Sequence, residues 1–468
     1  MNPEARARRW LPVWLARFLS RPRGAHPQAA QARTALSPEP SLRALACSLM
    51  MAASFVMVVW NLQDSSLENA NTGSRYATIE SLVDYGTYWI DQSRYIFTID
   101  KYKVGPHYIS SKPPMLPTIG AGVYWLYENT TGRGIRKFEG EVVRTVSLFT
   151  GGLCHLLFLV CFYRLCVLLL KRDVAILMAM AGACFAYLGV AYATAINNHS
   201  TAAGLAVCGL YLACAIRHGQ KKKWWHWPAA GFVLGLLPTI DLPCLAISGL
   251  LFLYLLAYDW KKTLLWFLPA MLPCLIAHLW MTYYVSGSFR PFYFNSELKT
   301  FKGFHWKNPG DIDGLHEPKY LYTFNMLLGH HGLFSMTPLY FFGLWELLRS
   351  LRHRRLLGES LVCLVSLGVF LAFFIVRTHN YGGWCVGMRW LVPLMPMLLL
   401  YFGLWIDRIR VTRLLWVLVL SAFMVSCFNV QDGLTSPFQF SVWHNWLENA
   451  PNRNRVGKLF NVRGFKRR

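Results

Sequence analysis

Residues 61–114 read NLQDSSLENANTGSRYATIESLVDYGTYWIDQSRYIFTIDKYKVGPHYISSKPP, a polar segment in a chain that is otherwise mostly apolar. The part of it from Leu62 to Lys112 lies between the first and second hydrophobic segments and is rich in acids, bases and aromatic residues. A simple connector is short and chemically plain, whereas long and varied loops are commonly functional. We therefore expect this loop to carry the functional site.

The overall composition indicates a membrane protein. Of the 468 residues, 54% are hydrophobic and only 15% are charged, which is typical of a polytopic α-helical membrane protein rather than a soluble enzyme. The net charge of +24 would suggest a nucleic-acid partner in a soluble protein. Here the basic clusters separate hydrophobic segments, as the positive-inside rule predicts for cytoplasmic loops, and no nucleic-acid partner is expected.

The twelve cysteines do not predict a disulfide framework. Eleven of them lie inside apolar runs, where cysteine behaves as a small hydrophobic residue. Only Cys385 falls in a candidate external loop, and no CxxC or Cys/His ligand spacing is present. The sequence therefore supports neither disulfides nor a zinc site.

The basic clusters predict the orientation of the chain. Residues 1–43 form an arginine-rich arm that we expect in the cytoplasm, so the first span, about 44–61, runs outward and places the long loop outside. The later clusters expected in the cytoplasm are Lys171–Arg172, Arg217 with Lys221–Lys223, Lys261–Lys262, Arg349 to Arg355 and Arg408 to Arg413.

Two segments determine how many times the chain crosses the membrane. Pro113–Tyr127 is short for a span, so we interpret it as a juxtamembrane or re-entrant helix on the outer side. Pro228–Tyr258 is long for one helix and is broken by Pro238, Asp241 and Pro243, so we predict two short antiparallel helices. These two choices keep every later basic cluster inside.

The resulting fold prediction is an all-α polytopic membrane protein with about eleven transmembrane helices. The membrane domain covers 44–430, with a large first external loop at 62–141 that contains juxtamembrane helices and a second at 285–335. A basic tail, 431–468, would then lie outside, against the positive-inside rule. The predicted spans are 44–61, 142–170, 174–195, 201–216, two within 228–258, 264–284, 336–348, 359–377, 391–407 and 414–430.

Two acids of the first loop are candidates for a general base. Asp91 follows TYWI and Asp100 follows YIFTI, so each is expected at the end of a short structured segment. A carboxylate in a partly enclosed cavity can accept a proton if its geometry and pKa suit the step. The structural alternative is that either acid caps a helix or pairs with a nearby base.

Lys112 is the candidate phosphate contact. It stands before two prolines in SSKPP, on a stiff backbone that suits a point charge meeting a phosphate. The alternative is a lysine that extends its charge to the membrane interface before a helix begins.

Two further candidates lie near predicted span ends. His199, in Asn197–Ser200, is either a functional imidazole or a polar tip satisfied at the interface. Asp241 would interrupt a helix pair at membrane depth, where an ionisable residue is costly and usually functional.

The segment NYGGWCVGMRW, residues 380–390, combines three glycines with Arg389. The glycines allow close approach of a ligand, and the guanidinium offers a fork for phosphate or carboxylate. Interfacial anchoring would explain the tryptophans equally well but not the glycines. His330, His331 and Arg377 are further external candidates of lower weight.

Taken together, the first loop, SRYATIESLVDYGTYWID through TIDKYKVGPHYISSKPP, and the later GWCVGMRWLVPLMP resemble the GT-C superfamily of membrane glycosyltransferases over about 44–405. Its members include aminoarabinose, protein O-mannosyl and lipopolysaccharide-type sugar transferases that use polyprenyl-phosphate sugars. The resemblance implies a GT-C fold with an external active site and a contact between Lys112 and the lipid-linked phosphate. The acidic pair that the family carries before Arg75-Tyr76 is missing, since Thr72-Gly73-Ser74 stand there. We therefore assign the base to Asp100 and then to Asp91.

The resemblance implies an inverting transferase of a hexosyl or pentosyl group in the inner or plasma membrane, with the lipid-linked sugar and membrane lipid as its partners. Arg75, His107, His199 and Asp241 are expected to help Lys112 and Arg389 bind the substrate or its phosphate. A divalent metal would assist, but no compact carboxylate cluster calls for one. The alternatives are a transporter or lipid flippase, for which broken helices around Asp241 are typical, a non-catalytic GT-C-like protein, or a membrane scaffold.

Overall fold

The computed structural model describes residues 41–65, 69–219, 223–304, 318–352, 356–378, 380–383 and 385–449. Most of the predicted arm 1–43, and the part of the predicted tail beyond residue 449, lie outside these residues.

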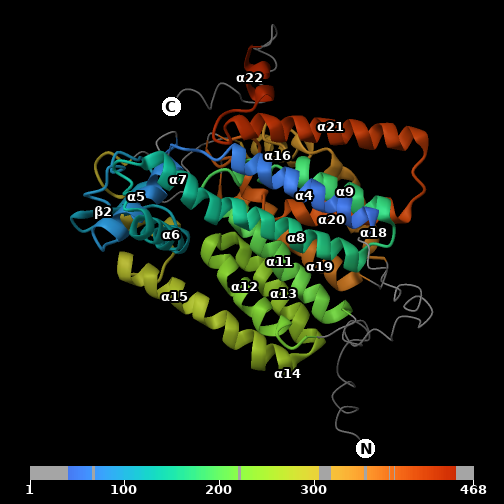
Figure 1. Ribbon diagram of the computed structural model, residues 1–468, viewed down its shortest axis with the longest axis horizontal. Coiled ribbons are helices and arrows are strands. Elements are labelled where there is room, and N and C mark those ends of the chain that lie inside the picture. Colours follow the sequence, from blue (N-terminus) through green and yellow to red (C-terminus); the bar gives the residue numbers. More distant parts are fainter. Residues whose placement is uncertain are drawn as a thin grey trace, which may run out of the picture.

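Helices dominate the described chain, with a single hairpin of two strands (Figure 1). The first part contains α4 (Leu42–Trp60), α5 (Ala70–Asp84), β1 (Lys101–Val104), β2 (His107–Ser110), α6 (Met115–Thr131), α7 (Glu139–Ser147), η2 (Leu148–Gly152), α8 (Leu153–Leu169), α9 (Asp173–Phe185), α10 (Gly189–Tyr192) and α11 (Asn198–His218). The middle contains α12 (His226–Ile240), η3 (Leu242–Cys244), α13 (Leu245–Tyr258), α14 (Trp260–Lys262), η4 (Thr263–Phe267), α15 (Leu268–Ser286), η5 (Phe292–Phe294), η6 (Ser296–Lys299), α16 (Lys319–Leu327) and α17 (Leu333–Met336). The last part contains α18 (Leu339–Ser350), α19 (Leu357–Arg377), η8 (Arg389–Leu391), α20 (Met395–Arg408), α21 (Arg413–Thr435) and α22 (Val442–Asn449).

Within the described residues, six helical segments are long and apolar enough to cross a membrane. Their outer faces remain apolar, as at Leu49 and Val56 of α4 and Ile276 and Trp280 of α15, which are all exposed. Exposed apolar area of this extent is stable against lipid rather than water. The chain is therefore an integral membrane protein. The six segments are Leu42–Trp60, Glu139–Leu169, Asn198–His218, Trp260–Ser286, Leu357–Arg377 and Arg413–Thr435.

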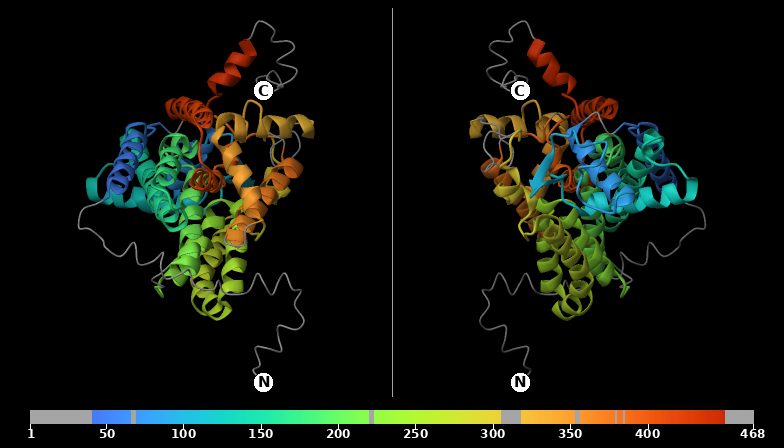
Figure 2. Two further views of the ribbon diagram at one scale, coloured as in Figure 1. Left: turned by 90° about the vertical axis from the view of Figure 1, so that its right-hand side faces the viewer. Right: turned by 90° about the vertical axis from the view of Figure 1, so that its left-hand side faces the viewer.

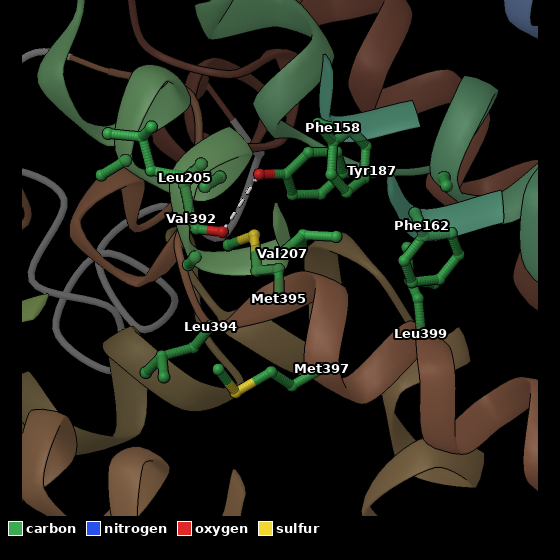
Figure 3. Packing of buried hydrophobic residues seen from close by; sticks show 14 of the residues in the cluster. Phe158, Phe162, Tyr187, Leu205, Val207, Val392, Leu394, Met395, Met397 and Leu399 are labelled. Atoms are coloured by element: carbon green, nitrogen blue, oxygen red, sulfur yellow. Dashed lines mark hydrogen bonds between the residues drawn. The ribbon is translucent and has the colours of Figure 1, made fainter. Parts of the chain in front are cut away.

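The helix boundaries agree with most of the predicted spans and correct one. The break predicted around Asp241 is confirmed, because α12 ends at Ile240 and α13 begins at Leu245. The segment 174–195 is not one continuous helix, since α9 ends at Phe185. The chain turns there so that Tyr187 packs against Phe158 and donates a hydrogen bond of 3.1 Å to the Val392 carbonyl (Figure 3).

Small residues allow the helices to pack closely. Gly231 and Gly235 lie four residues apart on α12 and face η4 and α15, where a Cβ would come within 2.1 Å of the Phe267 carbonyl oxygen and 2.5 Å of that of Met271. Such pairs are typical of membrane helix interfaces, because they let two backbones approach.

The elements of the first loop gather at one end of the long helices. β2, α5, α6 and α7 lie together at the left of Figure 1. The right-hand panel of Figure 2 faces this end of the molecule and shows the hairpin there. Asn69 caps α5 by accepting a 2.8 Å bond from the Thr72 amide. The hairpin closes at Gly105, whose φ of +57° a two-residue turn requires.

Candidate functional site

The hairpin brings Asp100 and Lys112 together. Asp100 directly precedes β1, and the pairing of Lys101 with Ser110 places it opposite Ser111, whose amide donates a 3.1 Å bond to the Asp100 carbonyl oxygen and which directly precedes Lys112. Lys112 Nζ lies 2.9 Å from Asp100 Oδ2, with the two side chains only 8% and 14% exposed. Ser74 of α5 holds this pair in place, since its hydroxyl donates a 2.5 Å bond to the Asp100 carbonyl oxygen.

Arg75 connects the first loop to the bundle. It is buried in α5, where its Nη1 donates to the Asn71 carbonyl oxygen at 3.0 Å and its Nη2 donates to Asn198 Oδ1 at 2.5 Å. Burial lowers the pKa of this guanidinium to about 10, with Tyr293 opposing and Arg389 adding to the shift. Arg75 is thus a buried cation close to a second one.

His199 and Asp241 form a second buried pair. His199 lies in the first turn of α11, not beyond the end of the preceding span, and Asp241 occupies the break between α12 and α13. His199 Nδ1 lies 2.6 Å from Asp241 Oδ2. Asn197 caps α11 by accepting a 2.8 Å bond from the His199 amide, so the imidazole is held at a fixed helix end.

Arg389 closes the site from the other half of the chain. It begins the short helix η8 and is buried, and its guanidinium carbon lies 5.7 Å from the centre of the Phe438 ring. Its buried Nε donor has no hydrogen-bond partner among the described residues. An unpaired buried donor is costly, so its presence points to a ligand that accepts the bond.

Gly382 makes room for Arg389. Its φ is +102°, and a Cβ at this position would lie 2.8 Å from Arg389 Nε. Asn380 holds the turn, with its Oδ1 accepting bonds of 3.0 Å from the Gly382 amide and 2.6 Å from the Gly383 amide. The glycines at 382 and 383 therefore have different functions.

This difference gives a matched pair of variants. We expect Gly382→Ala to displace the guanidinium and to weaken binding of an anionic ligand by more than tenfold. Gly383→Ala, at a φ of +84° but with no atom within 4 Å of the added Cβ, should cost only backbone strain of about 1–2 kcal/mol. Thermal unfolding and ligand titration of both variants measure the two effects. Equal ligand affinity in the two variants would contradict the role of Gly382.

Electrostatic interactions connect the two buried pairs and the two arginines in one site. Arg75 interacts with Asp100, Asp241 and Arg389, and Lys112 interacts with Asp100, Arg75 and Arg389. Three buried cations therefore meet two carboxylates. Burial lowers the pKa of Lys112 to about 8, which Asp100 opposes and the two arginines reinforce. An added anion would relieve the repulsion among the cations.

Tyr293 also belongs to the site, although the sequence did not predict it as a site residue. It belongs to η5, in the second large loop, and interacts electrostatically with Arg75, Asp100, Asp241 and Arg389. Burial raises the pKa of its phenol, so Tyr293 is a neutral donor in this site. An aromatic residue near Pro291 in a membrane-proximal loop is typical of interfacial anchoring, and no signal distinguishes the two roles.

Two predicted residues lie elsewhere. Asp91 and His107 pair with each other at 3.2 Å, with side chains about one-third exposed. The His107 ring also stacks on Trp89, at 3.9 Å between ring centres. Of the eight predicted residues of greater weight, the structure therefore brings six together and leaves this pair at the surface. The six are Arg75, Asp100, Lys112, His199, Asp241 and Arg389.

The donor set of the site does not form a group of three metal ligands. Asp100 is engaged by Lys112, and Asp241 is engaged by His199. Among the described residues, three potential ligands approach one another only at His330, His331 and His444. The positive charges that the side chains of this site supply are those of Arg75, Lys112 and Arg389.

The apolar helices and the polar site at their end belong to an integral membrane protein with the GT-C fold. The chain is similar to ArnT from Cupriavidus metallidurans in its structures bound to undecaprenyl phosphate and in the apo state, with TM-scores of 0.52 and 0.53 and 16% identity. These comparisons cover 80% of this chain and 62% and 61% of ArnT, so the chain spans about three-fifths of the length of that protein.

A third similar structure is the Archaeoglobus fulgidus oligosaccharyltransferase in its apo form, with a TM-score of 0.47 and 13% identity over 90% of this chain and 60% of that one. The sequence matches no protein-family model and no curated protein. The GT-C fold that the first loop and residues 383–396 predicted is confirmed by the ArnT comparison.

Proposed function

We propose that this protein is a membrane glycosyltransferase that moves a sugar from a polyprenyl phosphate carrier to an acceptor hydroxyl. The observation that supports this most is the set of three buried cations, Arg75, Lys112 and Arg389, around two carboxylates. Uncompensated buried cations are costly and are retained where they bind an anion. The bound undecaprenyl phosphate of the similar ArnT structure presents such an anion.

The cations would act on the leaving group. In the lipid-linked sugar the phosphate is a diester, and breaking its bond to the sugar adds one negative charge. Lys112 and Arg389 would meet this charge as it develops, and Arg389 Nε has a donor available for it among the described residues. Groups fixed in advance around a developing charge lower the barrier most effectively.

Asp100 is the proposed base. The acceptor oxygen would attack the anomeric carbon on the face opposite the phosphate, the bond from that carbon to the phosphate oxygen would break, and Asp100 would take the hydroxyl proton. This sequence inverts the anomeric centre. Asp100 lies 2.9 Å from Lys112, so a phosphate that draws Lys112 toward itself would release the carboxylate to act as a base.

His199, Asp241 and Tyr293 would bind hydroxyl groups of the sugar or the acceptor. The pair of His199 and Asp241 combines an acceptor and a donor within 2.6 Å, and neutral Tyr293 can donate or accept. Asp241 was also the reason to consider a transporter. Its position within the same cluster as Arg75 and Asp100 favours the enzyme.

The proposed orientation follows the basic clusters. The N-terminus and the loops after α8, α13 and α20 would be cytoplasmic, and the polar site would face the extracytoplasmic side of the inner or plasma membrane. The apolar helices around the site would hold the isoprenoid tail. The sugar would be a hexose or a pentose.

Binding of the phosphate should depend on pH through Lys112. The lysine is charged below its pKa of about 8 and neutral above it, so affinity for undecaprenyl phosphate should fall as the pH rises from 7 to 9. Titrations at several pH values measure this midpoint. Lys112→Arg, which stays charged throughout, should remove the decline. A decline that persists unchanged in Lys112→Arg would contradict the assignment.

The transfer itself is tested in reconstituted vesicles. We expect the full chain to move label from a polyprenyl-phosphate sugar to an acceptor drawn from an extracytoplasmic membrane fraction. Movement of the intact lipid across the bilayer without loss of its sugar would instead identify a flippase. Tight binding of the lipid without either process would identify a non-catalytic protein of the same fold.

A further inference from the structure

Three histidines gather outside the polar site. His330 and His331 lie between α16 and α17, and His444 belongs to α22. One nitrogen from each ring lies within 4.8 Å of the nitrogens from the other two, and all three residues are buried. The ring centre of His330 lies 4.7 Å from that of His331 and 4.9 Å from that of His444.

We propose that His330, His331 and His444 bind one divalent transition-metal ion of the zinc class. Imidazole nitrogens bind Zn²⁺ at about 2.0–2.1 Å, which places ligands around one ion roughly 3.4 Å apart. Ring rotations of about an ångström bring the three nitrogens from their present spacing to that distance. Burial favours neutral imidazole, which is the form that binds a metal.

Aromatic neighbours fix the planes of two of the rings. His331 stacks on Tyr381, with an angle of 16° between the rings, and His444 stacks on Phe440, with an angle of 5°. Ligands held in this way lose little freedom when an ion binds. The cluster is therefore arranged as a binding site rather than as three mobile side chains.

The backbone around His444 is also held. Ser441 accepts a 3.2 Å bond from the His444 amide, and Trp443 Nε1 donates a 2.6 Å bond to Asn429 Oδ1 of α21. α22 has only eight residues, and short helices depend on tertiary contacts for their stability. A metal bound to His444 would attach α22 to the segment between α16 and α17.

The proposed ion would also brace the loop that carries Arg389. The Val386 amide donates a 3.1 Å bond to the Pro437 carbonyl oxygen, and Arg389 lies against Phe438. The chain from 437 to 444 thus touches the polar site at one end and the histidine cluster at the other. The ion would have a structural role, holding this segment in position without contacting the substrate.

The test uses the full chain in detergent, stripped with a chelator and titrated with ZnCl₂ and then with CoCl₂. We expect one Zn²⁺ per chain by calorimetry and the visible absorption bands of four-coordinate Co²⁺. His331→Gln and His444→Gln should each weaken Zn²⁺ binding by about a hundredfold. His226→Gln, which changes a buried histidine at the start of α12, should leave it unchanged.

Two results would overturn the proposal. One is a wild-type protein that takes up less than one Zn²⁺ per chain or gives the spectrum of hydrated Co²⁺. The other is unchanged Zn²⁺ binding in the double variant His331→Gln/His444→Gln. The Co²⁺ spectrum of the wild type decides the question even if a variant fails to fold. A rise in the melting temperature of the wild type with Zn²⁺, absent in His444→Gln, would support the structural role.

Discussion

Asp100→Asn is expected to lower the rate of sugar transfer by about a hundred- to ten-thousandfold, which is the contribution typical of a positioned general base. The side chain keeps its size and its place beside Lys112, but it loses the capacity to accept a proton. Affinity for undecaprenyl phosphate should stay equal or increase, because Lys112 loses the carboxylate that competes with the phosphate for its charge. Single-turnover transfer and equilibrium binding separate the two effects.

Asp91→Asn is the matched control. It makes the same change in the same loop, but in a pair with His107 that is about one-third exposed and outside the cluster. We expect transfer within about twofold of the wild type, since exposed pairs contribute little. Full turnover by Asp100→Asn, or a large loss in Asp91→Asn, would remove Asp100 as the base.

Arg389→Met should lower transfer by about a hundred- to thousandfold, the effect of losing one preorganised contact to a developing negative charge. Unlike most buried substitutions, it should leave the melting temperature equal or higher. The reason is that the side chain has an unpaired Nε among the described residues and interacts unfavourably with Arg75 and Lys112. Functional residues often carry such a cost in stability.

The same variant should change the titration of Lys112. Arg389 contributes to lowering the pKa of this lysine, so its removal should move the midpoint of the pH dependence above 8. Arg133→Met provides the control, because Arg133 is exposed and pairs with Glu141 outside the site. Loss of stability in Arg389→Met without loss of transfer would show that the guanidinium has a purely structural role.

The sequence was informative where one local rule dominated. Asp241 and Pro243 stand at the predicted helix break, because proline cannot continue a helix without losing a hydrogen bond, whereas Pro238 lies inside α12. The helix expected after Lys112 is present, since α6 begins at Met115 with Pro114 as its N-cap residue. The resemblance over 44–405 predicted the GT-C fold.

The sequence was uninformative where contacts depend on distant segments. The short hairpin β1–β2 was missed because its strands have only four residues each, yet its register places Asp100 opposite Ser111 and so brings its side chain to Lys112. Nothing local separates Asp91 from Asp100, and only the three-dimensional arrangement places one at the surface and the other beside Arg75. The same holds for His331 and His444, which lie far apart in the chain.

The proposed function requires the phosphate of a lipid carrier to bind among Arg75, Lys112 and Arg389. Determining the structure of the full chain with undecaprenyl phosphate in a lipid nanodisc would show where that phosphate lies. We predict it within hydrogen-bond distance of Lys112 Nζ and the Arg389 guanidinium, with Lys112 drawn away from Asp100. A phosphate bound elsewhere, with the pair of Lys112 and Asp100 intact and Arg389 untouched, would contradict the proposed site.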